Sequence, residues 1–177
     1  TMRIHENTEF NQFDISQFTD LNGFTEINEA KHTQIHHVDL DNDTDIDLIG
    51  FHKNSGLLYI MENHGNSTTA FVRKDIDKIQ SEVMGVVSVD IDSDGDRDLI
   101  TVQMDSTLGV YYNLGNLTFS SRTILNTINF NPSSYSLPNL HVADINNDGL
   151  EDVIMEIPDD TDIANIQSEL LFFDNIG

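Results

Sequence analysis

The sequence predicts an all-β protein made of propeller-type blades, each a four-stranded antiparallel sheet. Three observations predict this fold: an Asp-rich loop that repeats in register, an aromatic run ending in Asn-x-Gly after each loop, and short strand-like runs without helical periodicity between them. The first aspartates of the loops, Asp39, Asp90 and Asp144, stand 51 and 54 residues apart. Roughly 50 residues carrying four short strands is the length of one propeller blade.

Each loop places oxygen-bearing side chains at its positions 1, 3, 5 and 9. The loops span residues 39–47, 90–98 and 144–152. The expected side-chain ligands are Asp39, Asp41, Asp43 and Asp47 in the first loop, Asp90, Asp92, Asp94 and Asp98 in the second, and Asp144, Asn146, Asp148 and Asp152 in the third. At position 7, where only the backbone carbonyl is expected to bind, the residues are Asp45, Asp96 and Leu150.

This pattern indicates calcium, with about three ions, one in each loop. Calcium takes roughly 6–8 oxygen ligands, and carboxylates crowded this closely repel one another unless a cation lies between them. Glycine at position 6 of two loops permits a sharp turn, whereas Thr44 at that position of the first loop predicts strain. On charge alone the third loop, with the Asn146 amide in place of a carboxylate, should bind most weakly.

Other interpretations of the loops fit less well. An EF-hand needs a carboxylate at position 12 and flanking helices, but Gly50, Thr101 and Met155 stand there, between strand-like runs. Zinc prefers His and Cys ligands, which the loops lack. Acidic turns without an ion would not explain three copies in register. Magnesium stays open, although a cage built wholly from protein suits calcium better.

The second motif, the aromatic run ending in Asn-x-Gly, is expected to be a strand followed by a turn rather than a ligand site. Its copies are residues 58–65, 110–115 and 171–177. After the motif comes an Asn and, three to five residues later, a Phe. These pairs are Asn66 with Phe71 and Asn116 with Phe119, and a similar pair, Asn7 with Phe10, stands near the start of the chain. Residues 126–138 and 158–167 interrupt the repeat and are expected to be exposed excursions.

The repeats make the chain one domain, residues 1–177, that is cut in the middle of a repeat unit. Three blades do not close a propeller, which typically needs 4–8. Residues 1–38, and within them Phe10 to Ile27, are therefore expected to complete the last blade, in a second chain if not in their own. A fragment of a longer protein, a homo-oligomer that completes the propeller, and a curved open array are the arrangements left open.

Charge and composition exclude several classes of partner and of chemistry. The 31 acidic against 8 basic residues give a net charge of −23, which repels nucleic acid and anionic lipid. The chain has no Cys, which excludes disulfides and thiolate catalysis. No apolar stretch approaches the roughly 20 residues of a membrane-spanning helix. No nucleophile–base motif or nucleotide-binding fingerprint is present, so no enzymatic activity is expected.

Taken together, the Asp loop, the strand after it and the Asn-x-Gly plus Phe resemble the FG-GAP/VCBS repeat family, which includes integrin α-chain propeller blades. The resemblance covers nearly the whole chain. It implies a propeller fold with calcium in the blade loops and metal ligands at the loop residues named above. The departures are Thr44 and Asn146, and neither removes an oxygen ligand.

The expected function is that of a calcium-binding module outside the cell or on its surface, which binds an unidentified glycan or protein without catalysis. The alternative is a scaffold or accessory part of a secreted carbohydrate-active enzyme such as a polysaccharide lyase. Such an enzyme needs a groove of basic or His residues, and only 8 Lys and Arg are present. A structural spacer without any ligand is a third interpretation.

Overall fold

A computed structural model of the chain describes residues 3–5, 18–20, 35–52, 56–65, 71–78, 82–128, 138–159 and 167–177. Its regular structure in these ranges consists of β-strands, and within them there is no helix long and apolar enough to cross a membrane. The chain divides into two compact units, Thr1–His32 and Thr33–Gly177. In the first unit, β1 (Arg3–His5) pairs with β2 (Phe18–Asp20) in an antiparallel sheet.

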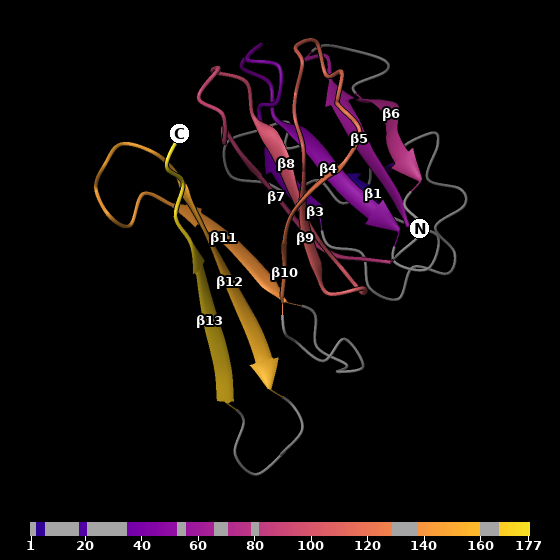
Figure 1. Ribbon diagram of the computed structural model, residues 1–177. Coiled ribbons are helices and arrows are strands. Elements are labelled where there is room, and N and C mark those ends of the chain that lie inside the picture. Colours follow the sequence, from indigo (N-terminus) through magenta and orange to yellow (C-terminus); the bar gives the residue numbers. More distant parts are fainter. Residues whose placement is uncertain are drawn as a thin grey trace. The chain divides into compact units, whose positions relative to one another are not determined.

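The second unit contains three antiparallel sheets, here called blades 1, 2 and 3 (Figure 1). Blade 1 consists of β3 (Ile35–Val38), β4 (Asp47–His52), β5 (Leu57–Asn63) and β6 (Phe71–Lys78). Blade 2 consists of β7 (Val83–Val89), β8 (Asp98–Gln103), β9 (Thr107–Tyr111) and β10 (Thr123–Thr127). Blade 3 consists of β11 (Asn139–Ala143), β12 (Asp152–Asp159) and β13 (Gln167–Phe173). Successive strands pair in chain order, which confirms the predicted all-β fold of propeller-type blades.

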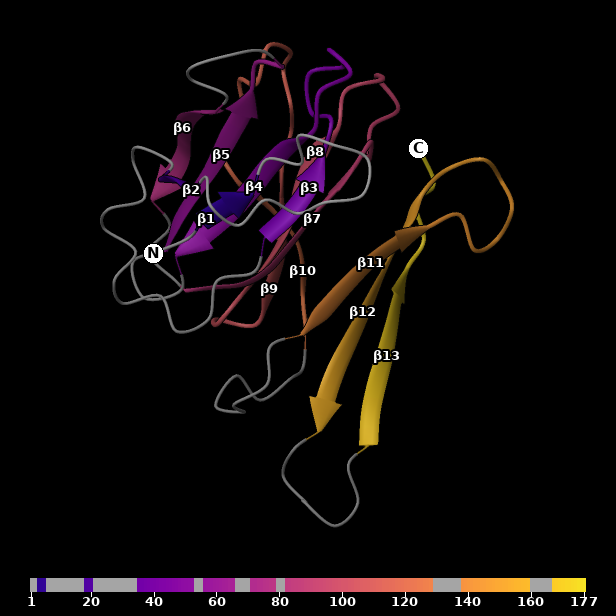
Figure 2. The ribbon, with the colours of Figure 1, turned by 180° about the vertical axis from the view of Figure 1, so that it is seen from behind.

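The blades differ in the number of strands within the described residues. Blades 1 and 2 have the expected four strands, and blade 3 has three side by side within the described ranges (Figure 2). The prediction that residues 1–38 complete the last blade falls mostly outside the described residues and stays a prediction. The three sheets form no closed ring within the part of the chain that the structure describes.

The excursion expected over residues 158–167 is shorter than the sequence suggested. The hairpin of β12 and β13 continues through the pairs Pro158↔Ser168 and Asp159↔Gln167, so backbone pairing extends beyond the apolar part of both strands. The expected excursion over residues 126–138 also begins later, because Asn126 and Thr127 pair with β9. Residues 129–137 and 160–166 lie outside the described residues.

The three Asp-rich loops occupy equivalent places, because each connects the first and second strands of a blade in the same register. The residue before each loop pairs with the aspartate at position 9, as Val38↔Asp47, Val89↔Asp98 and Ala143↔Asp152. Position 9 is therefore both the end of the loop and the first residue of the second strand. This register places the expected ligands of every loop at the same end of its blade.

Two apolar layers hold the blades together. The layer between blades 1 and 2 includes Ile49, Phe51 and Leu99, and the layer between blades 2 and 3 includes Ile100 and Val153. Neighbouring residues of β8 thus face opposite layers, as alternation along a strand requires. Each of these side chains is fully or nearly fully buried, which contributes roughly 1.5–3 kcal/mol per residue.

Blade 2 is covered on both faces near its first strand. Every residue of β7 is buried, and β7 contacts β3 and β4 of blade 1 as well as β11 of blade 3. Gly85 permits the close approach to blade 3, because a Cβ there would lie 3.2 Å from Leu140 Cδ1. All residues of the outer strand β10 are exposed. Burial therefore decreases from the first to the last strand of the blade.

Candidate metal centres

The three loops share one backbone conformation, in which the residues at positions 4 and 6 are left-handed. At position 4 the φ angles are 61° at Asn42, 61° at Ser93 and 63° at Asn147. At position 6 they are 79° at Thr44, 96° at Gly95 and 93° at Gly149. A positive φ is unfavourable for a β-branched residue, so the predicted strain at Thr44 is confirmed. The requirement at position 4 was missed, although two of its residues are Asn, which tolerates this conformation best.

The carboxylate at position 1 closes the turn of each loop. Its Oδ2 accepts the N–H of position 6 in all three copies, at 2.9 Å for Asp39, 3.0 Å for Asp90 and 3.0 Å for Asp144. The side chains at positions 3 and 5 each accept the N–H two residues ahead through Oδ1, at distances from 2.8 to 3.3 Å. Such local bonds curl the loop, which brings the side-chain oxygens together.

Carboxylates of two loops converge closely enough to hold one ion. Oxygens of Asp39, Asp41 and Asp43 lie within 4.8 Å of one another in the first loop, and those of Asp90, Asp92 and Asp98 do so in the second. Burial, and next the neighbouring Asp43, raise the pKa of Asp41 above its usual range. A cation would relieve that repulsion. These two loops are thus the stronger candidate centres within the described residues.

One buried oxygen in the second loop is left without a partner that a cation could supply. Asp90 Oδ1 is buried and has no hydrogen-bond partner, while Oδ2 of the same carboxylate is bonded to Gly95. A buried polar oxygen without a partner is rare in proteins, and a positive ion beside it would remove the penalty. The donor set of this loop, with oxygens only and Asp90 Oδ1 free to bind, therefore fits calcium.

The third loop is arranged differently around its amide. Asn146 Nδ2 donates to Asp148 Oδ2 at 2.9 Å and to Asp174 Oδ1 at 2.7 Å. Asp174 stands directly before Asn175 of the Asn-x-Gly motif, outside the predicted ligand set. Glu62 has the equivalent place in blade 1, where it adds to the negative potential that raises the pKa of Asp41. Both acids were missed, and their shared place before the motif Asn was the available signal.

The aspartates at position 9 are fully buried and bind the backbone. Oδ2 accepts the N–H of loop position 2, at 3.0 Å for Asp47, Asp98 and Asp152 alike. Oδ1 accepts the N–H of the motif Asn, at 2.8, 2.7 and 2.9 Å respectively. Each oxygen keeps further acceptor capacity, so the predicted role in closing a cage is compatible with this clamp.

The pKa values at position 9 differ between blades. Burial raises the pKa of Asp98 to about 6, and two backbone hydrogen bonds only partly oppose this change. Burial likewise raises the pKa of Asp47. Hydrogen bonds from the Asn175 and Ile145 backbone lower the pKa of Asp152 instead. The same residue type at the same motif position is thus tuned by the blade in which it lies.

The Asn-x-Gly motif forms the expected turn. The Asn Oδ1 accepts the N–H of the Gly two residues later, at 3.1 Å for Asn63, 3.1 Å for Asn113 and 3.2 Å for Asn175. Nδ2 donates to the carbonyl at loop position 8 of the same blade, at 3.2 Å in every copy. The turn therefore fastens the end of the third strand to the Asp-rich loop of the same blade.

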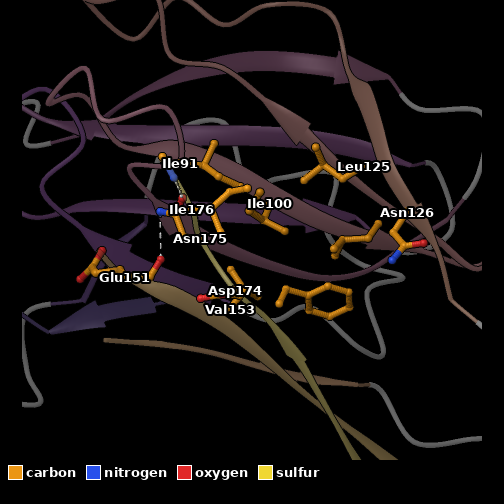
Figure 3. Close-up of a pocket in the computed structure, with 12 residues that line it drawn as sticks. Ile91, Ile100, Leu125, Asn126, Glu151, Val153, Asp174, Asn175 and Ile176 are labelled. Carbon is orange, nitrogen blue, oxygen red and sulfur yellow. Dashed lines mark hydrogen bonds between the residues drawn. The ribbon is translucent and has the colours of Figure 1, made fainter. Parts of the chain in front are cut away.

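A pocket of about 270 Å³ opens between blades 2 and 3, beside the third loop (Figure 3). Its apolar wall includes Ile100, Leu125 and Phe173, and its polar residues include Glu151 and Asp174. Figure 3 shows the Asn175 side chain at one side of this pocket, bonded to the Glu151 carbonyl. This seam pocket was not predicted, because its walls come from different blades.

Comparison with solved structures finds a protein of similar fold. A lectin from Agrocybe aegerita, described as specifically recognising non-reducing terminal N-acetylglucosamine, matches with a TM-score of 0.52 and 18% sequence identity. The match covers 80% of this chain and 39% of the lectin chain, so the chain spans about two fifths of that protein. A search of curated proteins found no matching sequence.

Comparison with protein families identifies the repeats. The sequence model described as an FG-GAP-like repeat matches residues 39–101 and 90–155. The two matches include all three Asp-rich loops and together cover more than half of the chain. The chain therefore belongs to the FG-GAP-like repeat family.

Proposed function

We propose that this chain is a calcium-binding, non-catalytic module of a propeller-type protein outside the cell, where it binds a glycan or a protein. The observation that carries the calcium assignment is the second loop. There, three carboxylates converge within 4.8 Å, and Asp90 Oδ1 is buried without a hydrogen-bond partner. The repetition of the loop backbone in all three blades extends the assignment to the other two loops.

Calcium would supply positive charge that offsets the repulsion between the carboxylates of each loop. The side chains at positions 1, 3, 5 and 9 would hold it, and the position 7 carbonyl is the expected backbone ligand. Calcium sites of extracellular modules bind with dissociation constants of about 10⁻⁴–10⁻³ M. Sites of that affinity would be filled outside the cell and largely empty in the cytosol, so the extracellular location is part of the proposal.

Calorimetric titration with calcium, together with thermal melting in calcium and in chelator, tests the assignment. We expect binding at millimolar calcium and a higher melting temperature in calcium than in chelator, because an ion that binds the folded state stabilises it. Asp92→Ala should remove one binding event, and magnesium serves as the competing ion. An unchanged melting temperature and no heat of binding at 10 mM calcium (about ten times the weakest expected dissociation constant) would exclude the proposal.

The seam pocket is the proposed ligand site. Its aromatic and apolar wall beside Glu151 and Asp174 suits a sugar ring, which presents an apolar face and hydroxyl donors at its edge. The lectin of similar fold supports a glycan over other small ligands. Saturation-transfer NMR with N-acetylglucosamine is a direct test, and oligosaccharides that end in N-acetylglucosamine can be assayed for cleavage, where we expect none.

Two exposed positions provide a matched pair for this test. Ile176→Arg fills the mouth of the pocket at a residue that is 85% exposed, so the fold should survive. Ile124→Arg changes a residue of β10 that is 59% exposed and does not line the pocket. We expect the first variant to lose sugar binding and the second to keep it. Equal sugar binding by both variants would show that the ligand binds outside the seam pocket.

A further inference from the structure

The asparagine of the Asn-x-Gly motif reaches from its own blade to the metal loop of the preceding blade. Asn113 Nδ2, in blade 2, donates to the Leu40 carbonyl in the first loop at 3.2 Å. Asn175 Nδ2, in blade 3, donates to the Asp90 carbonyl in the second loop at 3.2 Å. The partners are 73 and 85 residues apart in the sequence. The contact therefore depends on blade stacking and not on the local turn.

Both asparagine side chains are buried and hydrogen-bonded. They are 2% and 6% exposed. The two hydrogens of each Nδ2 have separate acceptors, one in the preceding loop and one at position 8 of the residue's own loop. The backbone N–H is bonded to the position 9 carboxylate, Asp98 for Asn113 and Asp152 for Asn175. A shift of the preceding loop is thus transmitted to a metal-ligand position of the next loop.

The bonds form a continuous series through the three loops. The first loop is bonded to Asn113, which is bonded to Asp98 of the second loop. The second loop is bonded through its Asp90 carbonyl to Asn175, which is bonded to Asp152 of the third loop. Asp90 itself is a predicted ligand with an unpartnered oxygen, so the second link begins at a ligand residue.

Two other side-chain contacts between neighbouring loops are more exposed. Asn42 Nδ2 lies 3.4 Å from Asp96 Oδ1 between the first two loops, and Arg97 pairs with Glu151 at 2.9 Å between the second and third. Exposed contacts of this kind contribute about 0–1 kcal/mol. The buried asparagine occurs at both seams and is the better candidate for coupling.

We infer that Asn113 and Asn175 couple calcium binding in adjacent loops, so that an ion in one loop favours binding in the next. This inference rests on the proposed calcium function. An ion would order the start of the preceding loop, including the carbonyl that receives the Asn Nδ2. The asparagine is then already ordered, and so is the position 9 carboxylate that it orients. Binding to a loop ordered in advance loses less conformational entropy, which produces positive cooperativity, and the coupling is reciprocal.

Asn63 is the matched control for this role. It makes the same bonds within its own blade, to Asp47 Oδ1, to the Ile46 carbonyl and from Gly65. It belongs to blade 1 and takes no part in the bonds that cross the two seams. Asn63→Ala therefore reports the effect of losing the turn itself, whereas Asn113→Ala also removes the link between the first and second loops.

The experiment follows calcium titrations by NMR of the whole chain, with the amides of Gly95 and Gly149 as separate reporters of the second and third loops. Asp41→Ala disables the first loop. In the otherwise unchanged chain, we expect this variant to weaken calcium binding at Gly95 about five-fold or more, the lower range of typical coupling. In an Asn113→Ala background, Asp41→Ala should change that affinity less than two-fold. In an Asn63→Ala background the five-fold effect should remain.

The second seam repeats the test in case Asn113→Ala does not fold. Asp92→Ala disables the second loop, and the amide of Gly149 is followed with and without Asn175→Ala. The inference is overturned if disabling one loop leaves the next unchanged in the parent chain, or if the coupling survives the Asn→Ala changes. Absence of calcium binding in the parent chain would instead refute the proposed function, so the two failures are distinguishable.

Discussion

The second and third loops carry the same motif in different surroundings. The second loop belongs to a blade with a neighbour on both sides, and burial raises the pKa of its Asp98 to about 6. In the third loop the pKa of Asp152 is lowered by backbone hydrogen bonds, and the Asn146 amide is bonded to two carboxylates. The second loop thus concentrates uncompensated charge, while the third offsets part of it with its own donors. The dependence on a cation should be greater in the second loop.

The largest expected effect comes from removing the carboxylate at position 9. Asp98→Ala leaves the part-buried N–H of Ile91 and the buried N–H of Asn113 without their acceptor, and each unsatisfied group costs about 1–3 kcal/mol. We expect a loss of roughly 2–6 kcal/mol in the free energy of unfolding, measured by urea titration in chelator. Asp152→Ala should cost less, because Ile145, one of the two residues whose N–H it accepts, is 52% exposed, so that water can replace the carboxylate there. An equal or greater loss at Asp152 would contradict the comparison.

Calcium should stabilise the second loop more than the third. At a calcium concentration ten times the dissociation constant, one site adds about 1.4 kcal/mol. Asp94→Ala should therefore remove more of the calcium-dependent rise in melting temperature than Asp148→Ala, its counterpart in the third loop. Each variant is compared with the parent chain in calcium and in chelator. A larger loss for Asp148→Ala would reverse the order of the two sites.

The two loops should also respond oppositely to pH in chelator. The raised pKa of Asp98 means that the folded state binds more protons than the unfolded state between about pH 4 and pH 6. This group therefore contributes stability at low pH, and that contribution is lost as the pH rises through about 6. The lowered pKa of Asp152 has the opposite sign, so its contribution is present above its unfolded value of 3.8 and lost as the pH falls.

Urea unfolding from pH 4 to pH 8 measures this difference. Asp98→Asn should reduce the loss of stability between pH 4 and pH 6, and Asp152→Asn should leave that interval nearly unchanged. Calcium should also reduce the loss, because a cation favours the ionised carboxylate. If Asp98→Asn leaves the pH profile of stability unaltered, the Asp98 carboxyl does not titrate in this pH range.

The smallest effect is expected in the first loop. Thr44 has a φ of 79°, a conformation that is strained for a β-branched residue. Thr44→Gly relieves a strain of about 1–2 kcal/mol but adds about 0.5–1 kcal/mol of entropy cost through the freer unfolded chain, so the net gain should be about 0.5–1 kcal/mol. Gly95→Thr is the reverse change in the second loop and should destabilise it. Equal melting temperatures for Thr44→Gly and the parent chain would indicate that the turn is unstrained.

Local features of the candidate sites could be predicted from the sequence to a useful extent. The repeat period, the strands after each loop and the turn at Asn-x-Gly depend on neighbouring residues. The need for a left-handed residue at position 6 was recognised, whereas the same need at position 4 was missed because Asn42, Ser93 and Asn147 are common polar residues in any loop. Asp174 was missed because it follows β13, 28 residues from Asn146 of the third loop in the sequence.

The sequence by itself determined which side chains curl into each loop, because positions 1 to 7 are close along the chain and their bonds are local. Only the tertiary structure decided which aspartates become buried, where the seam pocket lies and which carbonyl each Asn amide reaches. Those properties arise when sheets stack, since stacking removes Asp98 from water and brings Asn113 against Leu40 across a seam. Burial and long-range hydrogen bonding depend on neighbours that no local pattern specifies.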